Sequence, residues 1–354
     1  MESFCTSMNS FCIFARFMGF FPFAINGKSL KFTITSVAIT IASICVFLIE
    51  AICNLFHNYV FIEKDARFFD SHIWNWFLRF VHPITFLQIC IHMYKTKEIK
   101  EFYQHMQIVD LKFNHFYLQI DHSSQKKFVK FVMNFTLLLL FVRFCSSVII
   151  IEFLSSFEWN AIIQEIFYAR YLLYETFFCL QFIIPTYLLR KRFEILKELL
   201  DYQNFKSYRF FNINKFDEVF HDLCDAIKMI NSLFTFHLIP VIFEMMIVNI
   251  FGLYADFYLA RIKGNWQQIL MTSLYIIAHF ILKCLVAHIG NSTTNAVEEI
   301  IASIAKLISK LPSNDVSRFT FYNLLRQFQT RNFKFQSFFL TVNWNFLLAV
   351  SFYQ

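Results

Sequence analysis

Charged residues are scarce in this chain. Only 16% of its 354 residues are Asp, Glu, Lys or Arg, whereas a soluble domain carries about 25%. Hydrophobic residues make up 57%. Side chains that face lipid need no polar cover, so this deficit of charge favours an integral membrane protein over a soluble domain.

Residues that break helices are also few, with five Gly and five Pro in the whole chain. Long stretches without such breaks predict long helices. In lipid a helix satisfies all of its own backbone hydrogen bonds, which makes it the expected form of an apolar segment that crosses the bilayer.

Motifs for catalysis and cofactor binding are missing as well. The sequence has no HExxH, no GxSxG, no P-loop and no Gly-rich dinucleotide motif. Its nine Cys residues include no CxxC pair. The net charge of +7 is accompanied by no RNA- or DNA-binding motif. We therefore expect no enzyme activity, no metal, no cofactor and no nucleic-acid partner.

Apolar stretches of about twenty residues, the length that crosses a hydrocarbon core, recur along the chain. Six are complete, and a seventh runs from residue 335 to the end. The complete ones are 32–56, 73–94, 129–155, 166–189, 233–259 and 266–289. They predict an all-α fold, an integral membrane seven-helix bundle.

Basic residues are sorted between the segments that would face the two sides of the membrane. Lys and Arg accumulate in cytoplasmic loops. The N-terminal segment and the loops after the second, fourth and sixth spans hold 24 of them, and the other loops hold four. This asymmetry predicts a cytoplasmic N-terminus, the orientation opposite to that of a G-protein-coupled receptor.

Apolar stripes at helical spacing continue into the predicted cytoplasmic segments. One stripe is Phe193, Leu196 and Leu200, and others run through 213–232 and through 292–311, which ends at Pro312. They predict long cytoplasmic helical extensions. Such stripes need partners. They either pack on each other within one chain or join subunits together, and both interpretations stay open at this point.

Four regions follow from these patterns. Residues 1–31 form a cytoplasmic N-terminal segment, and residues 32–289 a six-helix transmembrane bundle with its cytoplasmic loops. Residues 290–334 form a cytoplasmic helical linker, and residues 335–354 the seventh, pore-type helix.

Ionisable and aromatic residues within the spans are the candidates for a ligand pocket, because a charge at membrane depth usually faces a partner or a cavity. Most lie in the predicted outer half, Glu175 among them, while Arg143 lies mid-membrane and Lys283 toward the inside. For any one residue, a structural ion pair or the interfacial aromatic belt is the competing explanation. The candidate ligand-binding residues are Arg79, His82, Arg143, Glu152, Arg170, Tyr171, Tyr174, Glu175, Tyr254 and Tyr275.

Two local patterns, together with the topology, resemble the insect gustatory receptor family over nearly the whole chain. Residues Phe14–Phe23, with Gly19 and Pro22, are similar to the Gly-x-x-Pro lead-in before the family's first span. Residues Leu324–Asn345 are similar to its amphipathic helix and its entry into the seventh span.

This resemblance implies a ligand-gated cation channel in the plasma membrane that detects a small-molecule tastant. It also implies a homo- or heterotetramer of related subunits, whose seventh helices line the pore. Helical spacing suggests Trp344, Leu348 and Ser351 as the pore-facing residues. The alternatives are a receptor of the G-protein-coupled type and a small-molecule transporter. The charge bias disfavours the first and the lack of internal repeats the second.

The end of the sequence departs from the family. The family's Thr-Tyr pair, followed five residues later by Gln-Phe, is missing, and alignment on Phe339 and Asn343 places it just beyond Gln354. Another register makes Gln354 the family's Gln but puts Leu347 and Leu348 in place of Thr-Tyr. We expect a truncated chain, because 17 residues span only about 25 Å of a core of roughly 30 Å.

The orientation is testable with an epitope placed before Phe32. We expect antibody to reach this epitope only after the cells are permeabilised, because the basic segments belong in the cytoplasm. Staining of intact cells would reverse the predicted topology.

Overall fold

The computed structural model describes a largely helical chain. It covers residues 4–18, 23–26, 29–61, 85–116, 120–154, 159–206, 212–235, 237–238, 250, 266–312, 316–330, 333–337 and 340–341. The α-helices are α1 (Phe4–Ser7), α2 (Asn9–Phe17), α3 (Ile34–Phe61), α5 (Thr96–Phe113), α6 (His122–Leu154), α7 (Trp159–Lys206), α8 (Ile213–Ile230), α10 (Trp266–Lys310) and α11 (Val316–Gln329).

Shorter elements complete the described residues. They are the 3₁₀ turn η1 (Asn114–Phe116), the π-helical turn η3 (Asn231–Thr235) and a helical segment over 85–94. Strand β1 (Phe23–Asn26) pairs antiparallel with β2 (Ser29–Phe32), and β3 (Gln336–Ser337) with β4 (Leu340–Thr341). The predicted all-α class is confirmed, with two small hairpins added. In the part of the chain that the structure covers, no helix is sufficiently long and apolar to cross a membrane.

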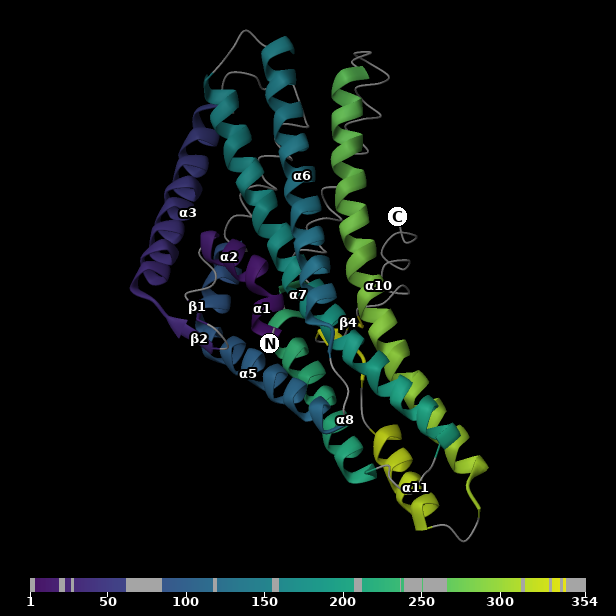
Figure 1. Cartoon of the computed structure of the whole chain (residues 1–354). Helices are drawn as coiled ribbons and strands as arrows, with labels where there is room; N and C mark the ends of the chain where they lie inside the picture. Colours follow the sequence, from purple (N-terminus) through teal and green to yellow (C-terminus); the bar gives the residue numbers. More distant parts are fainter. Residues whose placement is uncertain are drawn as a thin grey trace.

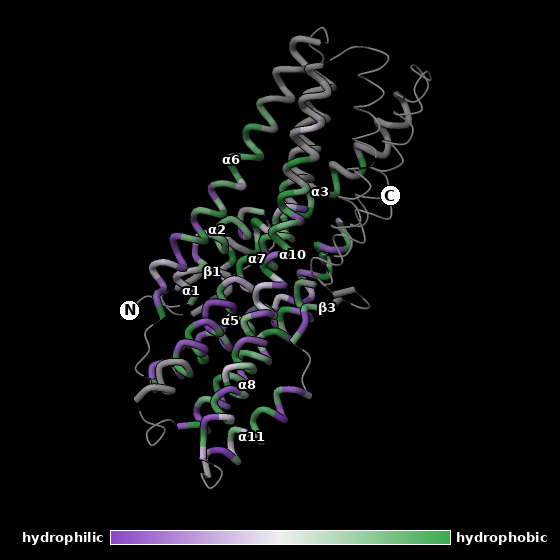
Figure 2. Tube along the Cα trace, turned by 90° about the vertical axis from the view of Figure 1, so that its right-hand side faces the viewer, coloured by the Kyte–Doolittle hydropathy of each residue, from purple (hydrophilic) through white to green (hydrophobic). Residues whose placement is uncertain are grey.

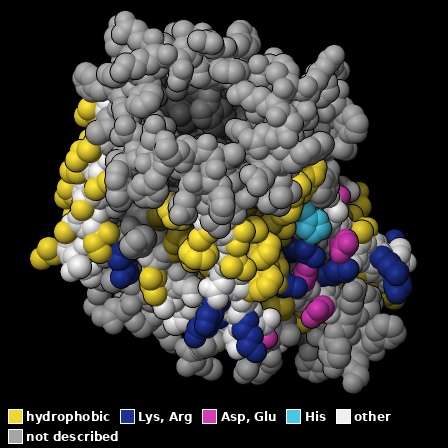
Figure 3. All heavy atoms as spheres, turned by 90° about the horizontal axis from the view of Figure 1, so that it is seen from above, with side chains coloured by type: hydrophobic (Ala, Val, Ile, Leu, Met, Phe, Trp, Pro, Cys, Tyr) yellow, Lys and Arg dark blue, Asp and Glu magenta, His cyan; other side chains and the backbone are white. Residues whose placement is uncertain are grey.

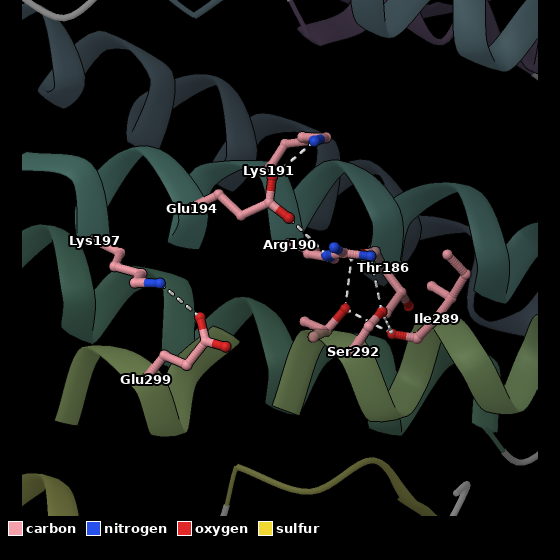
Figure 4. A network of polar contacts seen from close by, with 9 residues as sticks. Thr186, Arg190, Lys191, Glu194, Lys197, Ile289, Ser292 and Glu299 are labelled. Carbon is pink, nitrogen blue, oxygen red and sulfur yellow. Dashed lines mark hydrogen bonds and ion pairs between the residues drawn. The ribbon is translucent and has the colours of Figure 1, made fainter. Parts of the chain in front are cut away.

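Helices α7 and α10 form the frame of the molecule. They share the most extensive contact between any two elements described. With 48 residues, α7 is about 72 Å long, more than twice a hydrocarbon core of roughly 30 Å. Arg190 Nη1 donates to Ser292 Oγ at 3.1 Å, and seven residues further along both helices Lys197 Nζ pairs with Glu299 Oε2 at 2.9 Å (Figure 4). The two helices therefore run parallel.

A base of shorter helices surrounds the C-terminal halves of this frame. Helices α5, α8 and α11 gather there (Figure 1). Aromatic rings join them, since Phe220 of α8 stacks on Phe328 of α11 at 3.8 Å and meets Phe193 of α7 edge-on at 5.9 Å. The apolar stripe of α8 is buried throughout: Phe216, Val219, Phe220, Leu223, Cys224, Ala226, Ile227 and Ile230. The predicted stripes thus pack on each other within one chain.

Side-chain caps and a proline mark where these helices begin and end. Asn212 Oδ1 accepts a hydrogen bond from the Lys215 amide at 3.1 Å at the start of α8. Asp121 Oδ1 accepts one from the Ser124 amide at 3.0 Å at the start of α6. Each cap satisfies an amide of the first turn that has no partner within the helix. Helix α10 ends at Lys310, two residues before Pro312.

The N-terminal helices pack into the bundle. Phe4 and Met8 are fully buried. The ring of Phe4 meets that of Tyr103 on α5 edge-on at 5.5 Å, and Phe11 stacks on Phe177 of α7 at 5.5 Å. The structure thereby places the N-terminus at the same end of the bundle as α5 and the start of α6. Nothing in the sequence pattern predicted α1 or α2.

A buried ion pair links the N-terminal helix to three others. The Arg192 side chain on α7 has no exposed surface, and its Nε and Nη2 donate to the two carboxylate oxygens of Asp110 on α5 at 2.7 and 2.9 Å. His122 Nε2 of α6 lies 3.7 Å from the same carboxylate, and Ser7 Oγ of α1 donates to the His122 carbonyl at 3.2 Å. We call Ser7, Asp110, His122 and Arg192 the Arg192 cluster.

Two further contacts complete the surroundings of the guanidinium. Arg192 Nη1 donates to the Leu188 carbonyl at 2.6 Å. The Phe4 ring lies 5.1 Å from the guanidinium carbon, within the range of a cation–π contact. Ionic, hydrogen-bonding and aromatic partners thus replace the water that this charge has lost.

Polarity divides the molecule along its long axis. Hydrophilic residues gather around α5, α8 and α11, and hydrophobic ones predominate on the described parts of α6 and α10 beyond the base (Figure 2). Exposed apolar side chains continue along α3, α6 and α10, with Ile34, Ile41, Phe131, Phe141 and Ile277 each more than half exposed. Such a face is stable in contact with lipid and unfavourable in water.

Removal of one partner of the buried pair tests its role in the base. We expect Asp110→Ala to destabilise the protein by about 3–5 kcal/mol, because it leaves the Arg192 charge buried without its carboxylate. The double variant Asp110→Leu with Arg192→Met should recover most of this loss, because it removes both charges. The apparent Tm of the purified chain in neutral detergent measures both effects.

The exposed pair Lys197–Glu299 supplies the matched control. Its side chains are 36% and 57% exposed, so Lys197→Ala should change stability by less than about 1 kcal/mol. An equal loss in Lys197→Ala and Asp110→Ala would contradict the importance given to the Arg192 cluster.

Candidate functional site

Polar side chains are buried in two groups within the apolar bundle, above the base. We call Gln88, His92, Glu175, Gln181, His237 and Lys283 the polar core. Each side chain has at most 4% of its surface exposed. They come from the helical segment 85–94, from α7, from residues 237–238 and from α10.

An acidic and a basic side chain lie near each other within the polar core. Glu175 on α7 and Lys283 on α10 lie close enough for their charges to interact. Burial of either charge alone is strongly unfavourable. The parallel packing of α7 and α10 therefore places opposite charges at the same level of both helices.

Two His residues and two amides form the other half of the polar core. Gln181 Nε2 lies 3.2 Å from Nε2 and 3.3 Å from Nδ1 of the His92 ring. Gln88 Nε2 donates to the His237 carbonyl at 3.0 Å. The His237 ring stacks on Phe178 at 5.0 Å and lies 5.9 Å from the His92 ring.

Chemically, the polar core offers hydrogen-bond donors and acceptors and one acidic and one basic group, with aromatic rings against its two His residues. Small-molecule sites typically combine these groups. The arrangement contains no metal site, since the described residues hold no group of three or more His, Cys, Asp or Glu side chains placed to bind an ion.

Two of the ten predicted ligand-binding residues belong to this part of the bundle. Tyr174 is buried beside the polar core, and Glu175 is part of it. Five others lie on described helices whose side chains at these positions fall outside the description: Arg143 and Glu152 on α6, Arg170 and Tyr171 on α7, and Tyr275 on α10. The remaining three, Arg79, His82 and Tyr254, lie outside the described residues, as do the pore candidates Trp344, Leu348 and Ser351.

The structure relates two residues whose depths the sequence pattern estimated separately. The sequence pattern placed Glu175 in the outer half and Lys283 toward the inside, yet the structure brings them within electrostatic reach. The reason lies in the register of α7 on α10, in which Thr293 Oγ1 donates to the Thr186 carbonyl at 3.4 Å. Counting residues from the end of each span gives a depth for each residue, but it does not give the axial offset between the two helices.

Sequence reasoning also missed Arg192 and Asp110. Arg192 stands in the run Arg190-Lys191-Arg192, which favours a solvated face of the predicted helix. The available signal was its spacing of four residues from both Leu188 and Leu196, which places it on the buried face of a continuous helix.

Comparison with known proteins identifies first the class and then the family. Over 97% of its length the chain is similar to a solved structure of the insect olfactory receptor OR5 from Machilis hrabei, with a TM-score of 0.71, 11% identity and 94% of that chain covered. The same receptor in complex with eugenol gives a TM-score of 0.69 at 11% identity and the same coverage. At this identity the likeness establishes the fold alone.

The family model for the 7tm chemosensory receptor matches residues 9–353. The chain therefore belongs to the 7tm chemosensory receptor family, in which a multi-pass plasma membrane protein is expected. It is a family of receptors rather than of enzymes. No curated protein matches the chain.

The charge pair of the polar core can be tested by a double-mutant cycle. We expect Glu175→Leu or Lys283→Met alone to lower the apparent Tm substantially, because each leaves a buried ionisable group without its partner in the apolar bundle. The double variant should be more stable than either single variant. Additive losses would show that the two charges do not interact.

Proposed function

We propose that the chain is a gustatory-type chemosensory receptor, a ligand-gated cation channel that opens when a small-molecule tastant binds. The family match over residues 9–353 is the observation that carries this proposal. A tastant that binds the open arrangement more tightly than the closed one shifts the equilibrium toward the open channel. The chain contributes shape, dipoles and charges to this step, and no covalent chemistry.

The polar core and its surroundings are the proposed ligand-responsive region. Tyr174 and Glu175 lie on the buried face of α7. They would contact the ligand together with Arg79, His82, Arg143, Glu152, Arg170, Tyr171, Tyr254 and Tyr275. Lys283, which interacts with Glu175, supplies a balancing charge. A small polar molecule would exchange hydrogen bonds with these groups and change how α7 packs on α10.

The proposed orientation has the N-terminus in the cytoplasm. Support comes from the base, where α5, α8 and α11 gather (Figure 1) together with most of the basic segments. The proposed assembly is a homo- or heterotetramer. Exposed aromatic residues on α11 support it. Phe319 and Tyr322 are 69% and 57% exposed at the polar end of the molecule. Contact with another subunit would remove these rings from water.

The pore-lining proposal for Trp344, Leu348 and Ser351 is tested by cysteine accessibility. Each is changed to Cys in cells that express the chain alone or with a related subunit, and currents evoked by a panel of sugars and bitter compounds are recorded. A positively charged thiol reagent should block the current at these three positions. Phe346→Cys, on the opposite face of the same predicted helix, should stay insensitive.

Three outcomes are informative. Current that is blocked equally at all four positions would contradict the assigned pore face. Current that is never blocked would place the pore elsewhere. Absence of any evoked current, despite surface delivery and a partner subunit, would contradict the channel proposal itself.

A further inference from the structure

The outward face of α6 combines two exposed lysines with a long apolar strip. Lys127 and Lys130 are exposed near the start of the helix. At 100° per residue they share one face with the side chains that follow. The apolar members of that face are Phe131 (66% exposed), Phe135 (41%), Leu138 (58%), Phe141 (63%) and Val142 (50%). We call these seven residues the α6 strip.

The opposite face of α6 is occupied by the protein. Val129, Met133 and Thr136 are buried, and α6 packs against α7, α10, α1 and α2. The rings of Phe131 and Phe135 stack on each other at 6.1 Å, so these two side chains form one aromatic surface on the strip. Apolar side chains gather with Lys and Arg side chains along their border on the face shown in Figure 3.

The charge at the start of the strip is uncompensated within the described part of the chain. Neither Lys127 nor Lys130 has an ion pair or hydrogen bond with a described residue. Helix α6 carries no acidic residue between His122 and Ile151. Phe128 stacks on Tyr187 of α7 at 3.6 Å, and the ammonium of Lys191 lies 5.7 Å from the centre of that ring. Lys191 of α7, which pairs with Glu194 at 2.7 Å, therefore lies at the same level.

The dimensions of the strip match one lipid molecule. From Phe131 to Val142 the helix rises about 17 Å, close to the roughly 15 Å of hydrocarbon in one leaflet. A phosphate headgroup at Lys127 and Lys130 would place its acyl chain along Phe131, Leu138 and Phe141. Basic residues attract anionic headgroups beside the membrane surface. A free anion would contact only the two lysines and would leave the apolar residues of the strip uncovered.

We propose that the α6 strip binds one anionic phospholipid, with its headgroup on Lys127 and Lys130 and its acyl chain on the apolar residues. This site is distinct from the polar core, and it goes beyond the proposed channel function because it requires no tastant and no current.

The test is a lipid titration of the purified full chain in neutral detergent, with apparent Tm as the readout. Phosphatidylserine should raise the Tm at lower concentration than phosphatidylcholine. In the double variant Lys127→Ala with Lys130→Ala, the concentration of phosphatidylserine for half-maximal stabilisation should rise roughly 30-fold, since each lysine near an anionic surface contributes about fivefold. Phosphatidylcholine should act on both proteins alike.

The matched control is Lys306→Ala with Lys310→Ala, which removes two exposed lysines of α10 on the base. It should respond to phosphatidylserine like the unmodified chain. If both double variants need equally more phosphatidylserine for half-maximal stabilisation, the effect follows net charge alone and the proposed site is wrong.

Two further experiments test whether a free anion or a second copy of the chain occupies the α6 strip instead of a lipid. Inorganic phosphate and glycerophosphoserine should leave the Tm unchanged, and stabilisation by either to the same extent as by lipid would overturn the lipid assignment. Leu138→Cys should form no disulfide between copies of the chain under oxidising conditions. Efficient crosslinking would make this face an interface between copies, and the proposal would be wrong.

Discussion

The fully buried guanidinium of Arg192 is the constraint on which the base of the molecule depends. A charge that has lost its water requires partners on every side. It finds them on α1, α5 and its own helix α7, through Phe4, Asp110 and the Leu188 carbonyl. His122 of α6 then joins the same carboxylate. Because one group is shared by helices from distant parts of the chain, the ion pair fixes their relative positions more specifically than apolar packing alone.

Above this base the molecule follows a different rule. There the exposed faces of α3, α6 and α10 are apolar, and polar groups turn inward to form the polar core. A soluble protein has the reverse arrangement. Helices α7 and α10, with 48 and 45 residues, are long enough to run through both the polar base and the apolar upper bundle.

Much of this fold could be predicted from the sequence, because its signals are local. The stripe from Phe216 to Ile230 gave the buried face of α8, and Pro312 gave the end of α10. The helical extensions followed from the stripes beyond residues 190 and 292. The hairpin of β1 and β2 and the short helices α1 and α2 were missed, since segments of four to nine residues carry too little periodicity.

What could not be predicted depends on register between helices. The pairing of Glu175 with Lys283 requires the axial offset of α7 on α10, which no single stretch of sequence contains. The same holds for Arg192 and Asp110, 82 residues apart. Tyr174 and Glu175 were found because an ionisable or aromatic residue in an apolar span is conspicuous by itself. Gln88, His92 and Gln181 do not stand out in the same way, because hydrogen-bonded amides and His residues occur in many protein cores.

The central claim is that a water-exposed base and a lipid-exposed upper bundle share the helices α7 and α10. A cryo-electron microscopy structure of the full chain in lipid nanodiscs tests it most directly. The lipid density should surround the exposed faces of α3, α6 and α10 and end near Lys127 and Lys130, with α5, α8 and α11 outside it. Lipid density around the Arg192 cluster, or solvent around the upper half of α6, would contradict the account.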